Sequence, residues 1–167
     1  FDPVDAMRLI EREQVTSWGP MGTMAYRVVH HPDVANYDLS SVVNVGSGGA
    51  PTSVELQEKI RATFPSARAS LGLGYGLTEC TALATLAFGE DLVRHPNSAG
   101  RPLPTVSVEI RDEGGRALPE GESGEIHVRS PLVMAGYWRN PQASAASIVA
   151  DRWLRTGDVG MLLEGRL

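Results

Sequence analysis

The stretch Val42-Val43-Asn44-Val45-Gly46-Ser47-Gly48-Gly49-Ala50-Pro51 indicates the fold class of this chain. The β-branched residues of 39–45 favour a strand that runs directly into the glycine loop at 46–51. Glycine lets such a loop turn sharply, approach a flat ring closely or expose its amides to an anion. Thr52 and Glu55 form a capping-box pair, so a helix is expected to begin at Thr52.

A second strand is expected over residues 68–73, and it enters another glycine-rich turn, Gly74-Tyr75-Gly76-Leu77-Thr78-Glu79. The order strand, loop, helix, strand is typical of α/β proteins. Open α/β sheets bind ligands beyond the carboxyl ends of their strands. The two glycine loops are therefore expected at neighbouring strand ends, where a ligand would bind.

The second glycine turn carries side chains suited to a nucleotide. Tyr75 lies between two glycines, which leaves its ring free to face a ligand, and Thr78 and Glu79 supply a hydroxyl donor and a hard oxygen ligand. Phosphate together with magnesium is bound by groups of this kind. Each residue also has an ordinary structural interpretation: Tyr75 as part of the core, Thr78 as a helix cap, and Glu79 as a first-turn carboxylate.

The rest of the chain divides into a helical first part and a strand-rich second part. A helix is expected over residues 1–13, with Asp2 as its N-cap and Pro3 at its first position. From about residue 100 apolar and polar residues alternate, which predicts strands. We therefore predict an α/β portion over residues 1–95 and a β-rich portion over residues 96–167. The other expected elements are a strand at 15–18, a helix ending at His31-Pro32, strands at 106–110 and 124–129, a short helix from Asn140-Pro141 to about Val149, and a hairpin at 153–167.

Asp158 follows Gly157 and is expected in a turn of that last hairpin. A carboxylate at this place can accept hydrogen bonds from the two hydroxyls of a ribose. A Gly-Asp pair is also a common residue choice for an ordinary turn. By itself this pair predicts only a turn, and a role in binding ribose is indicated only when the other motifs are considered with it.

Composition and charge exclude several classes of protein. The chain has 167 residues, 42% of them hydrophobic, and a net charge of −5 with only 15 scattered Lys and Arg residues, which argues against nucleic-acid binding. The single cysteine, Cys80, excludes an internal disulfide framework and fits the cytoplasm. No apolar run approaches the roughly 18 residues that a transmembrane helix needs. The start at Phe1 and the strand-like end at Leu167 indicate a piece of a longer polypeptide.

Four motifs in one order resemble the adenylate-forming superfamily, which includes acyl-CoA synthetases, luciferases and the adenylation domains of peptide synthetases. They are Ser47-Gly48-Gly49-Ala50-Pro51, Tyr75-Gly76-Leu77-Thr78-Glu79, Gly124-Glu125-Ile126 with Gly136-Tyr137-Trp138, and Arg155-Thr156-Gly157-Asp158. The resemblance covers essentially the whole chain and is strongest to acyl-CoA ligases. It implies an internal fragment of the large N-terminal domain, with a three-layer α/β portion and a mostly parallel sheet followed by a β-rich distorted barrel.

The same resemblance implies an activity and its ligands. The full-length enzyme would use ATP and Mg²⁺ to activate a carboxylic acid, expected to be a fatty acid, as an acyl adenylate and would then transfer the acyl group to CoA. The chain itself lacks the upstream phosphate loop and the downstream lysine-bearing domain of such enzymes, so we expect no ligase turnover from it alone. A fatty acyl-AMP ligase and a peptide-synthetase adenylation domain remain alternatives.

The resemblance also implies roles for individual residues. Thr78 and Glu79 would be catalytic, Thr78 at the α-phosphate and Glu79 as the magnesium ligand. Asp158 would bind the ribose hydroxyls. The residues implied to bind the nucleotide are Gly48, Gly49, Ala50, Pro51, Gly74, Tyr75, Gly76, Leu77, Thr78 and Asp158. Those implied to line the acyl pocket are Gly72, Gly74, Gly76, Thr81 and Ala82.

Three other classes of function remain open from the residues alone. A dinucleotide-binding oxidoreductase would use the 46–51 loop as a pyrophosphate cradle for NAD, although Pro51 stands where the third glycine of that fingerprint belongs. A cysteine hydrolase would use Cys80 with one of the four histidines, but no spacing connects them. A non-catalytic fragment with exposed apolar surface would self-associate.

Overall fold

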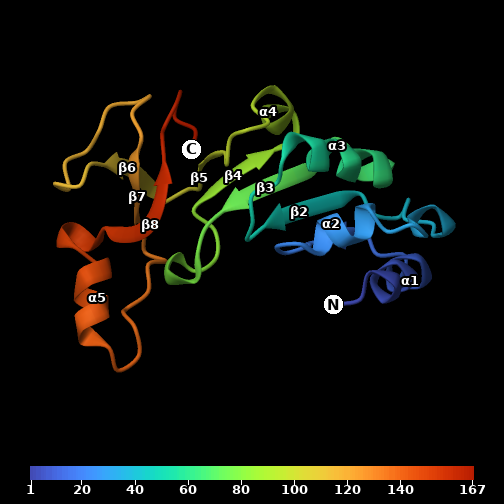
Figure 1. The fold of residues 1–167 in the computed structure, drawn as a ribbon, viewed down its shortest axis with the longest axis horizontal. Helices are drawn as coiled ribbons and strands as arrows, with labels where there is room; N and C mark the ends of the chain where they lie inside the picture. The colour runs from blue at the N-terminus through green and yellow to red at the C-terminus, as the bar shows by residue number, and fades with distance from the viewer. The chain divides into compact units, whose positions relative to one another are not determined.

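The computed structural model describes all residues from 1 to 167 and divides them into two compact units. The first unit contains residues 1–74 and 87–98, and the second contains 75–86 and 99–167. The chain passes between the units three times: within strand β3 (Leu71–Tyr75), within strand β4 (Thr85–Phe88) (Figure 1), and between Ser98 and Ala99. A division into domains near residue 95 stays a prediction.

The first unit is an α/β structure with parallel strands. Strand β1 (Ser17–Trp18) pairs with β2 (Asn44–Gly48), and β2 pairs with β3, both in parallel. The register places Gly48 opposite Gly74, so the two glycine loops begin at neighbouring strand ends, as the sequence predicts. The helices are α1 (Pro3–Glu13), α2 (Met24–Val29), α3 (Val54–Thr63) and α4 (Gly89–Arg94), with short 3₁₀ turns at Val34–Asn36 and Pro65–Ala67.

The helix caps agree with the sequence at α1 and differ at α3. The Asp2 carboxylate accepts hydrogen bonds from the backbone amides of Val4 and Asp5, at 2.8 and 3.1 Å. In α3 the cap is Ser53, whose hydroxyl accepts from the amide of Leu56 at 3.2 Å. The prediction of Thr52 as the cap was therefore wrong by one residue, because two neighbouring hydroxyl residues offer the same capping chemistry.

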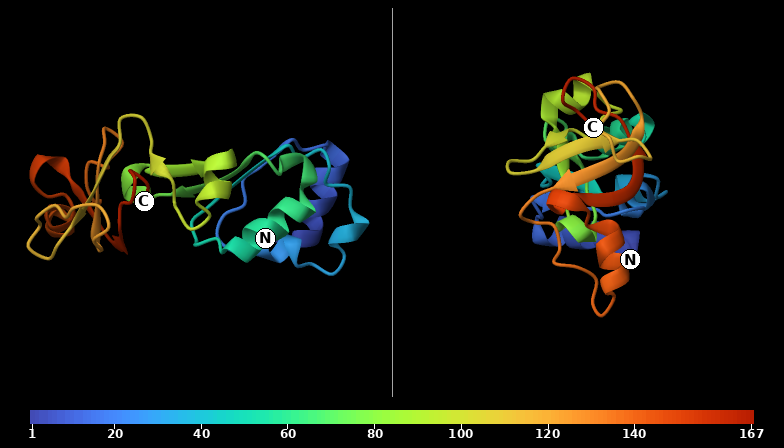
Figure 2. Two further views of the ribbon diagram at one scale, coloured as in Figure 1. Left: turned by 90° about the horizontal axis from the view of Figure 1, so that it is seen from above. Right: turned by 90° about the vertical axis from the view of Figure 1, so that its left-hand side faces the viewer.

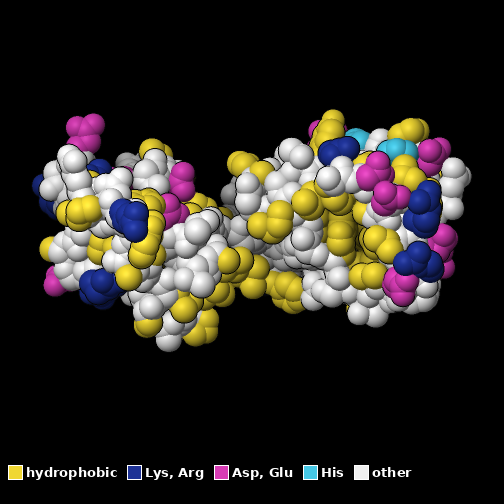
Figure 3. All heavy atoms as spheres, turned by 90° about the horizontal axis from the view of Figure 1, so that it is seen from below, with side chains coloured by type: hydrophobic (Ala, Val, Ile, Leu, Met, Phe, Trp, Pro, Cys, Tyr) yellow, Lys and Arg dark blue, Asp and Glu magenta, His cyan; other side chains and the backbone are white.

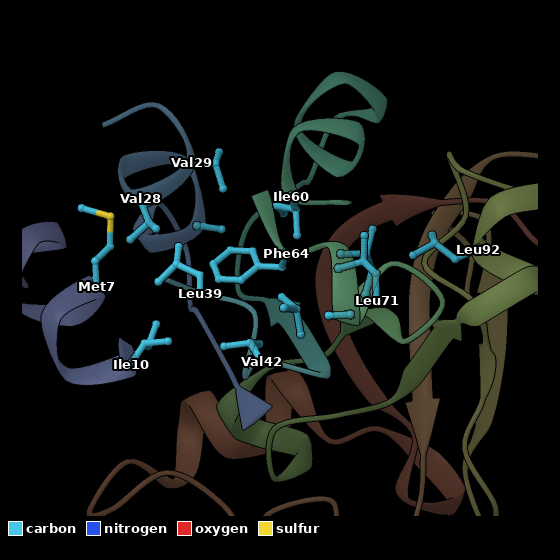
Figure 4. Close-up of a cluster of buried hydrophobic side chains, with 14 of the residues drawn as sticks. Met7, Ile10, Val28, Val29, Leu39, Val42, Ile60, Phe64, Leu71 and Leu92 are labelled. Carbon is cyan, nitrogen blue, oxygen red and sulfur yellow. The ribbon is translucent and has the colours of Figure 1, made fainter. Parts of the chain in front are cut away.

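A single apolar cluster holds the first unit together. Phe64 is fully buried at its centre (Figure 4). The centroid of its ring lies 5.2 Å from that of the Trp18 ring. Side chains from α1, α2, α3 and β3 converge on it because each element presents one apolar face. The other members labelled in the figure are Met7, Ile10, Val28, Val29, Leu39, Val42, Ile60, Leu71 and Leu92.

The second unit is built around a three-stranded antiparallel sheet of order β6-β7-β8, next to which α5 (Pro141–Ser147) contacts β8 (Figures 1 and 2). Its strands are β6 (Ser107–Arg111), β7 (Gly124–Arg129) and β8 (Leu154–Gly160), and β5 (Arg101–Pro102) pairs antiparallel with β4. Short 3₁₀ turns lie at Thr78–Cys80 and Ala150–Arg152. The expected α/β fold with a parallel sheet followed by a β-rich part is confirmed.

The last predicted hairpin was wrong. Strand β8 pairs with β7, and the residues after it form only an isolated bridge between Leu163 and Arg166. Asp158 therefore lies within a strand and not in a hairpin turn. Gly157 suggested a turn, but its role in the structure is different. It lies where the pairing register of β7 and β8 shifts between Glu125 and His127, and its φ of 78° is one that favours glycine.

Charged side chains of both signs are interspersed on the face drawn in Figure 3. This distribution agrees with the low count of Lys and Arg, 15 against 20 acidic residues. None of the helices has both the length and the apolar character required to cross a bilayer.

Candidate functional site

The turn after β3 folds back on itself and fixes the residues of the second glycine motif. The Tyr75 carbonyl accepts from the amide of Ala84 at 2.8 Å, and the Leu77 carbonyl accepts from Ala82 at 3.2 Å. This return brings the Ala82 carbonyl oxygen to 1.8 Å from the position that a Cβ on Gly76 would occupy. Only glycine fits at position 76, so this residue has a packing reason that is independent of any ligand.

Tyr75 and Asp158 meet directly. The Tyr75 hydroxyl donates a 2.7 Å hydrogen bond to Oδ2 of Asp158, which lies 83 residues further along the chain. Tyr75 is half-buried, and this burial, reinforced by the Asp158 carboxylate, raises the pKa of its phenol. The phenol therefore stays protonated and keeps donating, while Asp158 itself is exposed.

Thr78 and Glu79 begin a 3₁₀ turn whose N-cap is Leu77. Thr78 is therefore not the cap, whereas Glu79 does lie in the first turn, as the ordinary structural interpretation of that residue has it. Thr78 is exposed and Glu79 is partly exposed. Oε1 of Glu79 accepts a 2.7 Å hydrogen bond from the hydroxyl of Tyr137, which raises the pKa of that phenol. The second carboxylate oxygen, Oε2, accepts no hydrogen bond.

A charged network holds β8 in place next to Asp158. Glu125 on β7 accepts hydrogen bonds from Arg155 at 2.7 and 3.1 Å and from the Gly157 amide at 3.2 Å. Burial raises the pKa of the Glu125 carboxyl, but these donors outweigh that effect and lower it overall. The Thr156 hydroxyl accepts from the Asp158 amide at 3.1 Å, so the backbone that carries Asp158 is fixed by short-range contacts.

His127 lies behind this network as a buried group. Its Nε2 is 3.6 Å from Glu125, and its Nδ1 has no hydrogen-bond partner. Burial lowers the pKa of the imidazole, although the Glu125 carboxylate opposes the shift. His127 is therefore a neutral core histidine. Cys80 is also buried, and its thiol donates to the Leu77 carbonyl at 3.3 Å.

The first glycine loop begins inside β2. The Gly48 carbonyl accepts from the amide of Gly22 at 2.9 Å, and Gly49 has a φ of 74°, a conformation that favours glycine. Ala50 and Pro51 are exposed. Of the proposed acyl-pocket residues, Gly72 is buried within β3, whereas Thr81 and Ala82 are exposed and take left-handed φ values of 58° and 80°.

Tyr137 is the functional candidate that residue-by-residue reasoning missed. The sequence offered a signal, because Gly136-Tyr137-Trp138 is part of one of the four motifs, but no role followed from it. Tyr137 and Glu79 are 58 residues apart in the sequence. At that separation the spacing of the two residues cannot predict that their side chains meet.

A magnesium ion is compatible with this donor set. Across the chain no three His, Cys, Asp or Glu side chains gather as ligands of one metal ion. Mg²⁺ does not require such a cage, because it keeps several waters and takes one or two carboxylates together with the phosphates of a substrate. A single hard oxygen, such as Oε2 of Glu79, fits that mode of binding.

The comparisons with known proteins define the family. The model of the AMP-binding enzyme family matches residues 1–138, so the chain belongs to this family of adenylate-forming enzymes. The alternative of an NAD-binding oxidoreductase is therefore overturned.

Individual relatives include several kinds of ligase. The chain is 37% identical over 166 residues to 4-coumarate--CoA ligase 1 of Glycine max, covering 97% of this chain and 56% of that protein. It is 35% identical over 167 residues to the long-chain-fatty-acid--CoA ligase of Bacillus subtilis, covering 98% and 29%. The solved structure of amide bond synthetase McbA from Marinactinospora thermotolerans matches with a TM-score of 0.85 and 39% identity over 99% of this chain and 34% of that one. The chain thus spans between 29% and 56% of the length of these curated relatives.

Proposed function

We propose that the full-length protein activates a carboxylic acid with ATP as an acyl adenylate and transfers the acyl group to the thiol of CoA. The observation that carries the proposal is the 2.7 Å hydrogen bond between Tyr75 and Asp158. It joins the aromatic residue of one family motif to the carboxylate of another, although 83 residues separate them. An aromatic ring and a carboxylate held at this distance suit the base and the ribose of one nucleotide.

Within this proposal each side chain has a defined task. The ring of Tyr75 stacks on adenine, Asp158 accepts hydrogen bonds from the ribose hydroxyls, and the exposed hydroxyl of Thr78 donates to the α-phosphate. Glu79 would hold Mg²⁺, which when bound offsets negative charge on the phosphates. That the backbone of residues 48–51 packs against adenine stays a prediction from the sequence.

The proposed activity consists of two half-reactions. A carboxylate oxygen of the acid attacks the α-phosphorus of ATP, the bond to the bridging oxygen breaks, and pyrophosphate leaves. The thiol sulfur of CoA then attacks the carbonyl carbon of the acyl adenylate, AMP leaves, and the thiol proton is released. A hydroxyl donor at the α-phosphate lowers the barrier of the first step, because charge builds on the non-bridging oxygens as the carboxylate attacks.

For the acid we propose a fatty acid, and we keep an aryl acid as the second candidate. The relatives include both a long-chain-fatty-acid--CoA ligase and 4-coumarate--CoA ligases, at 35% and 37% identity. Of the proposed acyl-pocket residues, Thr81 and Ala82 are exposed and Gly74 and Gly76 are partly exposed, so a substrate can reach them, whereas Gly72 is buried. A cytoplasmic location and transfer to CoA instead of a carrier protein belong to the same proposal.

The test is pyrophosphate release by the full-length protein with ATP, Mg²⁺ and either hexadecanoate or 4-coumarate. Asp158→Asn is expected to raise the KM for ATP by roughly 10- to 100-fold, because hydrogen bonds to a charged acceptor are worth about 1.5–3 kcal/mol. Glu113→Gln, which neutralises an exposed carboxylate on the same unit, serves as the matched control. No acid-dependent pyrophosphate release, or an unchanged KM in Asp158→Asn, would refute the proposal.

A further inference from the structure

The segment between β7 and α5, residues 130–138, is fastened to the turn that carries Glu79, and we call it the strap. The Leu132 carbonyl accepts from the Thr81 hydroxyl at 2.7 Å, and the Met134 amide donates to the Glu79 carbonyl at 2.8 Å. The third contact is the 2.7 Å hydrogen bond from the Tyr137 hydroxyl to Oε1 of Glu79. The strap therefore holds both the backbone and the side chain of Glu79.

The strap is itself held in place by the core of the second unit, by Arg152 and by α5. Val133 is buried in the core of the second unit, and the guanidinium of Arg152 donates to the carbonyls of Val133 and Met134 at 3.2 and 3.0 Å. The hydroxyl of Ser144 on α5 accepts from the Tyr137 amide at 2.8 Å. A Cβ on Gly136 would lie 2.8 Å from that same hydroxyl oxygen, so glycine at 136 allows α5 to approach the strap.

These contacts make Tyr137 a rigid donor and not a loosely placed side chain. Its backbone is held by α5, and its phenol reaches Glu79 from a fixed position. The hydrogen bond occupies Oε1 and leaves Oε2 without a partner. Hydrogen bonds to a ligating carboxylate fix its rotamer, and their loss typically weakens metal binding by about 10- to 100-fold.

We propose that Tyr137 is a positioning residue for magnesium binding: it holds Glu79 so that the second carboxylate oxygen faces the metal ion of the nucleotide complex. The inference rests on the proposed function, because it requires Glu79 to be the magnesium ligand. It adds a role for Gly136-Tyr137-Trp138, the motif whose purpose neither the residue types nor the spacing explained. Tyr137 acts through Glu79 and does not touch the reacting atoms.

The experiment is calorimetric binding of ATP to the full-length protein, without carboxylic acid, so that no reaction occurs. Nucleotide affinity is measured over a series of Mg²⁺ concentrations and again in excess EDTA. Tyr137→Phe removes only the hydroxyl and is expected to raise the Mg²⁺ concentration for half-maximal tight binding by about 10-fold. Its affinity for metal-free ATP is expected to stay unchanged.

Two further variants separate the possible outcomes. Tyr26→Phe removes the hydroxyl of an exposed tyrosine in the first unit and is expected to leave Mg²⁺ dependence unchanged. In a Glu79→Ala background Tyr137→Phe is expected to have almost no further effect, because the hydrogen bond has already been lost. This non-additivity distinguishes positioning of Glu79 from a general effect on the fold.

The results decide between failure of this inference and failure of the proposed function. If Glu79→Ala weakens magnesium-dependent binding and Tyr137→Phe does not, or if Tyr137→Phe weakens metal-free and metal-bound ATP equally, the inference is overturned. If Glu79→Ala itself leaves the Mg²⁺ dependence unchanged, the assignment of Glu79 in the proposed function fails as well. Thermal denaturation of each variant shows whether the fold is intact.

Discussion

Replacing Gly76 by alanine is expected to destabilise the protein strongly, because the added Cβ would overlap backbone atoms. The position of that Cβ lies 1.8 Å from the Ala82 carbonyl oxygen, 2.7 Å from its carbon and 2.8 Å from Cα of Leu83. Ordinary contact begins at 3.4 Å, so the backbone at Ala82 must retreat by about 1.6 Å. No side-chain rotation can relieve this overlap.

The magnitude follows from the contacts that such a shift would disturb. Overpacking of a fitted site costs about 1–3 kcal/mol. The shift would also break the hydrogen bond from Ala82 to the Leu77 carbonyl and strain that from Ala84 to Tyr75, each worth about 1 kcal/mol. We therefore expect Gly76→Ala to lower the free energy of unfolding by about 3–5 kcal/mol.

Urea unfolding of the full-length protein measures this loss, and Gly46→Ala provides the matched control. Gly46 lies in β2, has no heavy atom within 4 Å of an added Cβ and takes no left-handed φ. Its replacement is expected to change stability by less than about 1 kcal/mol. If Gly76→Ala were no more destabilising than Gly46→Ala, the packing reason given for Gly76 would be wrong.

Three further predictions concern stability. Phe64→Ala is expected to cost about 3–5 kcal/mol in urea unfolding, because Phe64 is fully buried; a loss below about 1 kcal/mol would contradict the assigned core. Asn140→Ala removes the cap that accepts from Ala143 at 3.0 Å and is expected to cost about 1 kcal/mol, whereas Asn140→Ser should retain most of it. Burial lowers the pKa of His127 below 6.5, so the unfolded chain binds the proton more readily, and stability is expected to fall as the pH drops below 6.5 towards the lowered value. His127→Gln should flatten this part of the profile of stability against pH. The loss of stability that comes from protonation of Glu125, which starts below pH 4.5, should remain in the variant. If the variant lost stability with falling pH as steeply as the unchanged protein, another group would be responsible.

The sequence by itself determined the family, the glycine loops and several local features. The cap at Asp2, the start of α5 after Asn140 and the alternation in β6 and β7 depend on residues a few positions apart, so local chemistry was enough to predict them. The α/β class also followed from local order, since each strand leads directly into its glycine turn. The four motifs indicated adenylate-forming chemistry before any contact was known.

Only the tertiary structure decided which side chains meet. Tyr75 reaches Asp158 across 83 residues, and Tyr137 reaches Glu79 across 58, because the second unit brings strap, turn and β8 together. The same dependence on distant residues explains why the predicted hairpin at 153–167 was wrong. Strand β8 pairs with β7, and Gly157 lies at a shift in their pairing register and not in a hairpin turn. Local patterns report backbone conformation and burial, whereas hydrogen bonds between distant residues depend on where the whole chain places them.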